Sequence, residues 1–458
     1  MKQITFIILM FTVNLCAAQQ EKTFSEEQFL AVVKKYHPVV KQALIDVQIA
    51  NAEVRIARGQ FDPVISSGNA RKELDGTSYY DQRQTQIKIP TWYGIDIVAG
   101  QENISGSRVN PESTKGHLNY IGFSVPLVQN LVIDKRRAAL QQAKIFKDLS
   151  DVQRKAVVND LLSDAMKVYW EWWEQYHIHQ LMQNTLGVAA QRLHMVKVAF
   201  QLGDRPAIDT LEAFTQVQLL SVKQAENFAE LIKSQMQLST YLWAEKEQQY
   251  DLPMDVLPQQ WELNNELILD DILKASVRHP DLVQYSYKLD ILEVGKQLKF
   301  QSLLPQVHLK YNQIGSDISK TASAAWFQNN YRYGVSFSMP LRLSEGRGEY
   351  QKARLKIDHT RLEQVNKQAQ IQNKVKQYFT DWQQSNVQLN MQDKLVNNVS
   401  ALQRGEETRF ANGESSLFLI NAREQRTIEA RQKLIELKSK NRKALVSLQW
   451  SAGMFGQD

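Results

Sequence analysis

Two stretches of this chain are long and almost free of residues that break a helix. Residues 134–201 contain no proline and one glycine, Gly187, and residues 345–411 contain no proline and have glycines only near their ends. As helices, these 68 and 67 residues would each extend roughly 100 Å at 1.5 Å per residue. A rod of that length cannot pack into a globule, so the sequence predicts an elongated, mainly α-helical protein.

Apolar residues recur along both stretches with coiled-coil spacing, in steps of four and three. They are Ile145, Leu149, Val152 and Ala156, then Leu161, Ala165, Val168 and Trp172 in the first stretch, and Val375, Phe379 and Trp382 in the second. The remaining positions are rich in Gln, Lys, Asn and Asp. We therefore expect rods that pack on neighbours along one side and face water along another.

The chain contains one unit twice. His37-Pro38 and His279-Pro280 are 242 positions apart, and so are Pro63 and Pro305. In each half a His-Pro step precedes a helical stretch of about 25 residues, and a proline then opens a β-like segment. Proline is favoured in the first turn of a helix, where its fixed φ suits the helix and its missing N–H is no loss.

Further matching segments occur in the same order in both halves, and the number of residues between the members of a pair changes only slowly along the chain. "GFSVPLVQN" (122–130) matches "SFSMPLRLS" (336–344), so the first half carries 28 extra residues between its two prolines. Gly203 in "AFQLGDRPAIDTLEA" matches Gly413 in "RFANGESSLFLINAR". Each half thus reads as a short helix, a β-hairpin, a long outgoing helix, a glycine turn and a returning helix. The predicted domains are a first repeat (19–249), a linker (250–272) and a second repeat (273–458).

The segments between the paired prolines alternate as strands do. In "QTQIKIPTWYGIDIVAG", Ile87, Ile89, Tyr93, Ile95 and Ile97 share one side. Aromatic residues gather in these segments, including Tyr79, Tyr80, Trp92, Trp326, Tyr331 and Tyr333. They would either fill a soluble core or form the interface girdles of an outer-membrane barrel. One hairpin cannot close a barrel alone, so such a barrel would be shared among chains.

The N-terminal residues read as a signal peptide over 1–18. Lys2 supplies the positive start, Ile4 to Val13 are mostly apolar, and Cys16-Ala17-Ala18 fits a small-x-small cleavage site. A lipoprotein acylated on Cys16 is the alternative, although Leu15 stands where lipoproteins carry a small residue. Beyond this leader no apolar stretch is long enough for a transmembrane helix.

Nothing in the sequence indicates catalysis or a cofactor. Motifs of nucleophilic hydrolases, P-loop proteins and zinc proteases are missing, and we expect no enzyme activity. His177 and His179 point about 200° apart on a helix and cannot chelate one metal ion. Trp170, Trp172 and Trp173 suit packing between helices. The net charge of +6 is spread out, without a basic run for nucleic acid.

The duplicated order of "GQFDPV", "GFSVPL", "FQLGDRPAIDTLEA" and "RFANGESSLFLINARE" resembles the TolC-type outer-membrane efflux protein family over essentially the whole mature chain. The resemblance implies a homotrimer in outer-membrane lipid, in which each chain gives four strands to a twelve-stranded β-barrel. The long helices would form an α-helical tunnel across the periplasm. A periplasmic adaptor and, through it, an inner-membrane transporter would dock at the far end, so that drugs, metals, other small molecules or secreted proteins leave the cell.

The resemblance also assigns site residues. The paired turns would form the periplasmic tip that contacts the adaptor, and they consist of Leu202, Gly203 and Asp204 with Asn412, Gly413 and Glu414. Asp209 lies where some members carry an acidic tunnel-entrance residue, but Leu419 holds the equivalent position in the second half. Local capping or pairing of Asp209 is the alternative, as are ordinary hairpin turns without a partner.

A different class of function stays open at the level of sequence. A periplasmic coiled-coil scaffold or adhesion rod would also use long polar helices in antiparallel hairpins. Such a rod has no use for alternating aromatic strands, and these strands therefore favour the channel.

Overall fold

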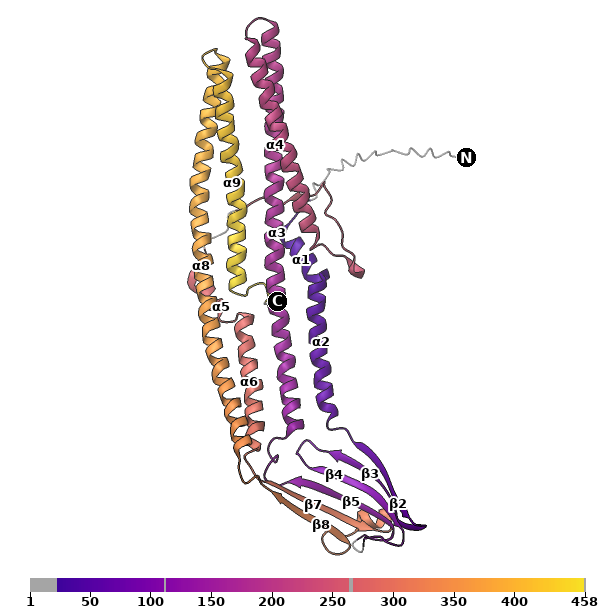
Figure 1. Ribbon diagram of the computed structural model, residues 1–458. Helices are drawn as coiled ribbons and strands as arrows, with labels where there is room; N and C mark the ends of the chain where they lie inside the picture. The colour runs from indigo at the N-terminus through magenta and orange to yellow at the C-terminus, as the bar shows by residue number, and fades with distance from the viewer. Residues whose placement is uncertain (1–22, 111–112, 263–266, 457–458) are drawn as a thin grey trace, which may run out of the picture. The chain divides into compact units, whose positions relative to one another are not determined.

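The computed structural model describes residues 23–110, 113–262 and 267–456 (Figure 1). The predicted signal peptide and Cys16 lie outside these residues. The chain forms two compact units. Unit 1 comprises Met1–Pro38, Leu161–Leu267 and Tyr378–Leu448, and unit 2 comprises Val39–Asp160, Ile268–Gln377 and Gln449–Asp458. Each predicted repeat contributes to both units, and the repeat bounds themselves remain a prediction.

Helices dominate the described chain, as the long proline-free stretches predict. They are α1 (Glu26–Tyr36), α2 (Pro38–Gly59), α3 (Lys135–Gln201), α4 (Ala207–Ser239), α5 (Leu269–Ser276), α6 (Pro280–Gln301), α7 (Ile318–Ser323), α8 (Ser344–Ala411) and α9 (Leu417–Ser451), with a 3-10 turn at Glu245–Glu247. The two long helices have 67 and 68 residues. Among the described residues, no helix combines the length and the apolar character needed to cross a membrane.

Both His-Pro steps mark the start of a helix, as predicted. Helices α2 and α6 begin at Pro38 and Pro280, and each has 22 residues. His279 is the N-cap of α6, and its Nδ1 accepts a hydrogen bond from the backbone N–H of Asp281 at 3.1 Å. Burial lowers the pKa of His279, so the neutral ring needed for this acceptor role is favoured. The repeat is therefore marked by local helix-start chemistry.

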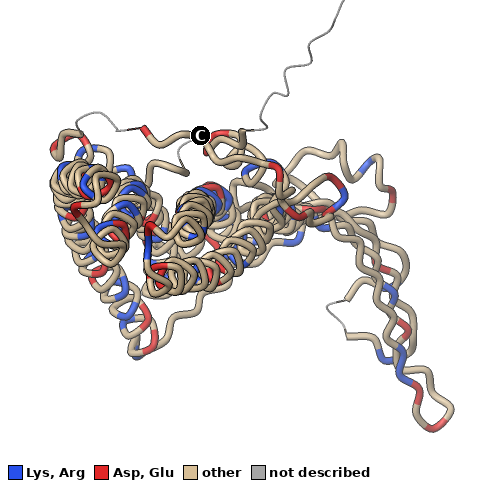
Figure 2. The backbone as a smooth tube through the Cα atoms, turned by 90° about the horizontal axis from the view of Figure 1, so that it is seen from above, with Lys and Arg blue, Asp and Glu red and all other residues tan. Residues whose placement is uncertain are grey.

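Of the predicted coiled-coil positions, Leu149, Ala165, Trp172, Val375 and Trp382 are buried and the other six are partly buried. In unit 2, buried residues of α3 contact α2 through Leu140 and α6 through Ala138. In unit 1, α3 packs on α4 and α9 in a cluster of Ile178, Met182, Ala189, Leu220 and Ile428. Val375 and Trp382 on α8 are also buried. Most other side chains of α8 are exposed, and basic and acidic residues intermingle along the helices rather than gathering in one place (Figure 2).

Six strands of unit 2 form one antiparallel sheet in the order β2-β3-β4-β5-β7-β8 (Figure 1). They are β2 (Val64–Leu74), β3 (Thr77–Pro90), β4 (Asp96–Ser105), β5 (Gly116–Pro126), β7 (Gln306–Gly315) and β8 (Tyr331–Ser338). In unit 1, the short strands β1 (Thr23–Phe24) and β6 (Leu257–Pro258) pair in parallel. The predicted class, mainly α with a β part built on duplicated helical hairpins, is confirmed.

The number of strands differs from the prediction of four per chain. The first half contributes β2 to β5, whereas the second contributes only β7 and β8. The 28 extra residues of the first half thus add a pair of strands. Asp75 and Gly76 make the added hairpin's turn, both with positive φ (51° and 68°), as a two-residue hairpin turn requires.

Candidate functional site

The two glycine turns of unit 1 have the same geometry. Gly203 and Gly413 adopt φ of 80° and 79°. In the first turn, the N–H of Gly203 donates to the carbonyl of Phe200 and that of Asp204 to Ala199, at 3.1 and 2.9 Å. The second turn repeats this pattern at 3.0 and 2.8 Å, from Gly413 and Glu414. Such a left-handed glycine satisfies the last carbonyls of a helix and lets the chain reverse.

All six predicted tip residues are exposed. Leu202 is the most apolar of them and is 72% exposed. Neither glycine has an atom within 4 Å of the place a Cβ would occupy. A side chain added at either glycine would therefore not clash with other atoms. It would strain the backbone, because both residues have positive φ.

The two hairpins contact each other next to the turns. The guanidinium of Arg205 lies over the ring of Phe410, 4.1 Å from its centroid, and its Nη2 donates to the Phe410 carbonyl at 3.3 Å. Val196, Ala213 and Leu417 form a buried cluster below this contact. Arg205 therefore ties the α3–α4 turn to the end of α8.

Asp209 pairs locally in the single chain. It lies in the first turn of α4, and its carboxylate is 3.7 Å from Arg205, which is four residues earlier. Both side chains are partly buried. At the equivalent position in the second half, Leu419 is exposed. The carboxylate is thus placed to hold the residue that joins the two hairpins.

A groove between α4 and α9 runs beside the turns. It is lined by Glu212, Thr215, Gln216, Leu219, Leu220, Lys223, Phe418, Asn421, Ala422 and Gln425. Phe418 is 67% exposed at one end. This groove was not predicted from the sequence, although Ile208, Leu211 and Val222 continue coiled-coil spacing on α4 and are exposed. This row of exposed apolar residues on α4 was the sequence pattern that could have indicated the groove.

A buried ion pair joins α3 to α9 below the turns. Arg192 and Glu424 meet in a two-pronged contact, with N–O distances of 2.8 and 2.9 Å. Both residues are buried. Asn421 accepts from Arg192 at 3.4 Å and donates to Glu212 on α4 at 3.3 Å. These hydrogen bonds connect the helices α3, α9 and α4 in one polar network. Bidentate Arg–carboxylate contacts are among the strongest hydrogen bonds between side chains.

The tryptophans of α3 form a packing core, as predicted. Trp170 and Trp172 are fully buried, and Trp173 is nearly so. The Trp173 indole donates to the carbonyl of Gln259 at 2.9 Å. Tyr169 donates its hydroxyl to the Phe24 carbonyl at 2.7 Å, and burial strongly raises its pKa. These rings hold the β1–β6 segment against α3.

His177 and His179 have different surroundings. The ring of His177 lies 4.2 Å from that of Trp173, whereas His179 lies 5.4 Å from Phe228 on α4. Burial lowers the pKa of His177 to about 4, so it is neutral at physiological pH. Within the described ranges there is no group of three or more His, Cys, Asp or Glu side chains placed to hold a metal ion.

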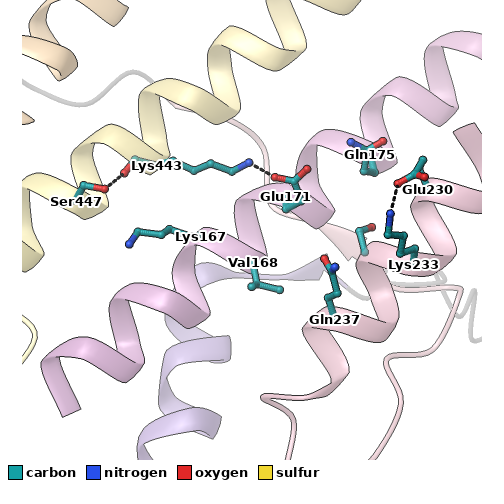
Figure 3. Close-up of a pocket in the computed structure, with 10 residues that line it drawn as sticks. Lys167, Val168, Glu171, Gln175, Glu230, Lys233, Gln237, Lys443 and Ser447 are labelled. Atoms are coloured by element: carbon teal, nitrogen blue, oxygen red, sulfur yellow. Dashed lines mark hydrogen bonds and ion pairs between the residues drawn. The ribbon is translucent and has the colours of Figure 1, made fainter. Parts of the chain in front are cut away.

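A polar pocket in the middle of unit 1 lies between α3, α4 and α9 (Figure 3). Lys443 of α9 forms an ion pair with Glu171 of α3, and Glu174 lies 3.6 Å from the same ammonium. Burial raises the pKa of Glu174. Across the pocket, Lys233 and Glu230 pair along α4. Both acidic and basic side chains line the pocket, so it presents no single-sign field to a ligand.

Comparisons with known proteins give similarity at the level of fold. No family model and no curated protein sequence matches the chain. Among solved structures, the CmeC outer membrane channel of Campylobacter jejuni superposes with a TM-score of 0.66 at 14% identity, covering 94% of this chain and 86% of that one. The open-state MtrE outer membrane channel of Neisseria gonorrhoeae gives 0.67 at 12%, covering 93% and 88%.

The outer membrane protein VceC of Vibrio cholerae is similar to the same degree. Its TM-score is 0.65 at 11% identity, with 93% of this chain and 96% of that chain covered. Coverage this complete means that the helices and the sheet are matched together, not one part alone. The chain therefore has the fold of the TolC-type outer-membrane channels, the family that its duplicated sequence resembles.

Proposed function

We propose that three copies of this chain form a passive exit duct in the outer membrane, with the long helices in the periplasm. The duct would conduct drugs, metals, other small molecules or secreted proteins. A periplasmic adaptor would dock on the turns of unit 1 and connect the duct to an inner-membrane transporter. In this proposal the chain performs no chemistry, and its partners supply the energy.

The observation that carries the proposal is the pair of exposed turns of equal geometry. They end two long hairpins in a fold whose solved examples include outer membrane channels. The groove beside the turns combines apolar surface from Leu219 and Phe418 with polar ends such as Gln216 and Gln425. A helical hairpin of an adaptor is a suitable occupant, because amphipathic helices lie in grooves of this kind.

The helical faces suit a water-filled bore. Most side chains of α8 are exposed, and the helix is rich in Gln, Lys and Asn. A scaffold rod would also have helices with solvent-exposed polar faces. It would not need the sheet of unit 2, which exposes apolar side chains such as Ile65 and Phe337. This sheet favours a membrane duct over the scaffold.

Planar-bilayer conductance of the purified protein tests the duct. We expect small conductance for the native protein and a clear increase for Arg205→Ala, because that change removes the contact tying the turn to Phe410. Lys233→Ala is the matched control, since Lys233 is an exposed cation on the same hairpin. A protein that inserts but passes no ions in either form would rule out the duct.

Export in cells tests the docking end. Gly203→Val and Gly413→Val force a β-branched residue into positive φ, at a local cost of roughly 1–3 kcal/mol, and should reduce export while trimers still form. Gly203→Asn and Gly413→Asn are the controls, because asparagine tolerates this conformation. If export were unchanged by both valine variants, the turns would not be the docking site.

A further inference from the structure

The extra hairpin of the first half continues the sheet without a break. Strand β3 pairs with β4 over ten residues, from Asp81 opposite Ser105 to Pro90 opposite Asp96. Strand β2 pairs with β3 along its full length, with one irregularity after Lys72. With 11 and 14 residues, the two strands are at least as long as the 9–11 residues of a typical membrane-spanning strand.

Near the helix-proximal ends of the strands, one face of the sheet is mainly apolar and the other mainly polar, and Ile65 of β2 and Ile87 and Ile89 of β3 lie on the apolar face. The register places these apolar side chains on one face: Ile65, Ile87, Ile89, Ile97, Ile121, Phe123, Leu309, Val335 and Phe337. It places these polar ones on the other: Ser66, Gln82, Gln84, Gln86, Lys88, Glu102, Lys310, Asn312 and Arg332. A mainly apolar face opposite a mainly polar one is the pattern of a barrel wall with lipid outside and water inside.

The polar face is the concave one. Glu102 on β4 and Arg332 on β8 form an ion pair at 3.4 Å although β5 and β7 lie between their strands. Neighbouring strands are about 4.8 Å apart, and the register places Arg332 opposite Val98, four residues along β4 from Glu102. Side chains this far apart across and along the strands meet only if the sheet curls toward them. The apolar face is therefore on the outside of the curve, where Ile65 and Phe337 are 71% and 68% exposed.

Specific contacts hold the added strands in this wall. Tyr120 of β5 lies across Gly100 of β4, where a Cβ would come within 2.7 Å of its hydroxyl. That hydroxyl accepts from Gln84 at 2.9 Å and donates to Gln86 at 3.1 Å, both on β3. An aromatic ring spanning a glycine in this way reinforces strand register.

The turn between β3 and β4 is anchored to the helices of unit 2. The ring of Trp92 stacks on Phe61, just after α2, at 4.3 Å. Asp96 pairs with Lys88 at 2.8 Å and with Arg136 of α3 at 3.0 Å. The added hairpin is thus fixed to its neighbour strands and to the helix that leaves the sheet, as a permanent part of the wall.

Both edges of the sheet are open in the single chain. Strand β2 pairs only with β3, and β8 only with β7, within the described residues. All side chains of both strands are exposed. In lipid, an unpaired edge leaves several N–H and C=O groups unsatisfied, and only closure removes it. The two edges must therefore find strands from other copies.

We propose that β2 of one copy pairs with β8 of the next, so that three copies close an eighteen-stranded barrel with six strands from each. This inference rests on the trimer of the proposed function. Barrel diameter grows nearly linearly with strand number, so this exit would be about 1.5-fold wider than one of twelve strands. Barrels of 16–18 strands hold an aqueous channel. Selection of cargo then lies with the helical end, and the exit accommodates bulky cargo.

Pairwise cysteine crosslinking tests which strand meets β8 of the next copy. The one cysteine of the sequence, Cys16, lies in the predicted signal peptide, so introduced thiols are distinctive. Ser67 and Val335 each lie three residues from the helix-proximal end of their strand and face the same side. A chain that carries both Ser67→Cys and Val335→Cys should form covalent dimers and trimers when treated with a short bismaleimide. If the register between β2 and β8 is shifted, Ser67→Cys combined with Tyr333→Cys or with Phe337→Cys should give these oligomers instead.

The matched control moves the first thiol from β2 to β4. Ala99→Cys combined with the same three partners should give no covalent oligomers, because β4 lies inside the wall between β3 and β5. Crosslinking from Ala99 rather than Ser67 would mean a twelve-stranded wall with β2 and β3 outside it, and would overturn the proposal. If neither the Ser67→Cys combinations nor the Ala99→Cys combinations gave covalent oligomers, the proposal would also be overturned. The conductance experiment decides the duct separately.

A lipid-contact measurement gives a second, independent readout. A fluorophore on Ile87→Cys should be quenched by nitroxide-labelled lipids, because Ile87 of β3 lies on the apolar face. The same fluorophore on the adjacent Gln86→Cys should keep its emission, because Gln86 faces the polar side. Equal quenching at the two positions would show that the added hairpin is not in the wall.

Discussion

Glu424→Met should strongly destabilise the turn end of unit 1. The change leaves the Arg192 guanidinium buried without the carboxylate that it contacts at 2.8 and 2.9 Å. Removing one partner of a buried ion pair costs about 3–5 kcal/mol, because the remaining charge has lost its compensation. Amide hydrogen exchange in α3 and α9 around the pair measures this opening locally. We expect exchange there to accelerate roughly a hundredfold or more.

The double variant Arg192→Met with Glu424→Met is the control. Replacing both charges by apolar side chains of similar size is often neutral or stabilising. Exchange in α3 and α9 should then return close to the native rate. If the single variant exchanged no faster than the native protein, Arg192 would have another compensating partner and the pair would not secure these helices.

Trp172→Ala should lower the stability of unit 1 to a similar extent. Trp172 is fully buried, and its ring lies 5.6 Å from that of Tyr169 and 6.4 Å from that of Tyr176. Emptying such a site costs about 3–5 kcal/mol through lost burial and a residual cavity. The apparent melting temperature of the detergent-solubilised protein should fall by roughly 10 °C.

Trp172→Phe is the matched control for this cluster. Phenylalanine keeps most of the ring volume, and the Trp172 indole N–H has no hydrogen-bond partner among the described residues. The phenylalanine variant should therefore melt close to the native protein. If phenylalanine were as damaging as alanine, the indole nitrogen would have a role that packing does not explain.

The helical architecture was predictable because its signals are local. Proline-free runs, a Pro-initiated helix after each histidine, and glycines at the reversals act within a few residues of the chain. The predicted bounds of the long helices agree with α3 and α8 to within one residue at each end. The paired turns followed from the same local chemistry, because Gly203 and Gly413 permit the positive φ that a tight reversal needs.

The strand count was not predicted, although one signal was present. Asp75-Gly76 is a strong hairpin turn signature, but its flanking strand β2, "VISSGNARKEL", lacks clear alternation. Its place in the sheet comes from pairing with β3 and from contacts such as Gln84 with Tyr120, 36 residues away. Contacts between residues this far apart in the sequence depend on which strands pack side by side, so the periodicity within one segment does not reveal them.

The groove beside the turns and the Arg192–Glu424 pair were missed for the same reason. Leu219 and Phe418 lie on different hairpins, and the ion pair joins residues 232 positions apart. By itself, the sequence determined the repeat, the helix lengths and the reversals, because these depend on backbone preferences of neighbouring residues. Only the tertiary structure decided how many strands share the sheet and which charges are buried together, because both depend on contacts that form when distant segments pack.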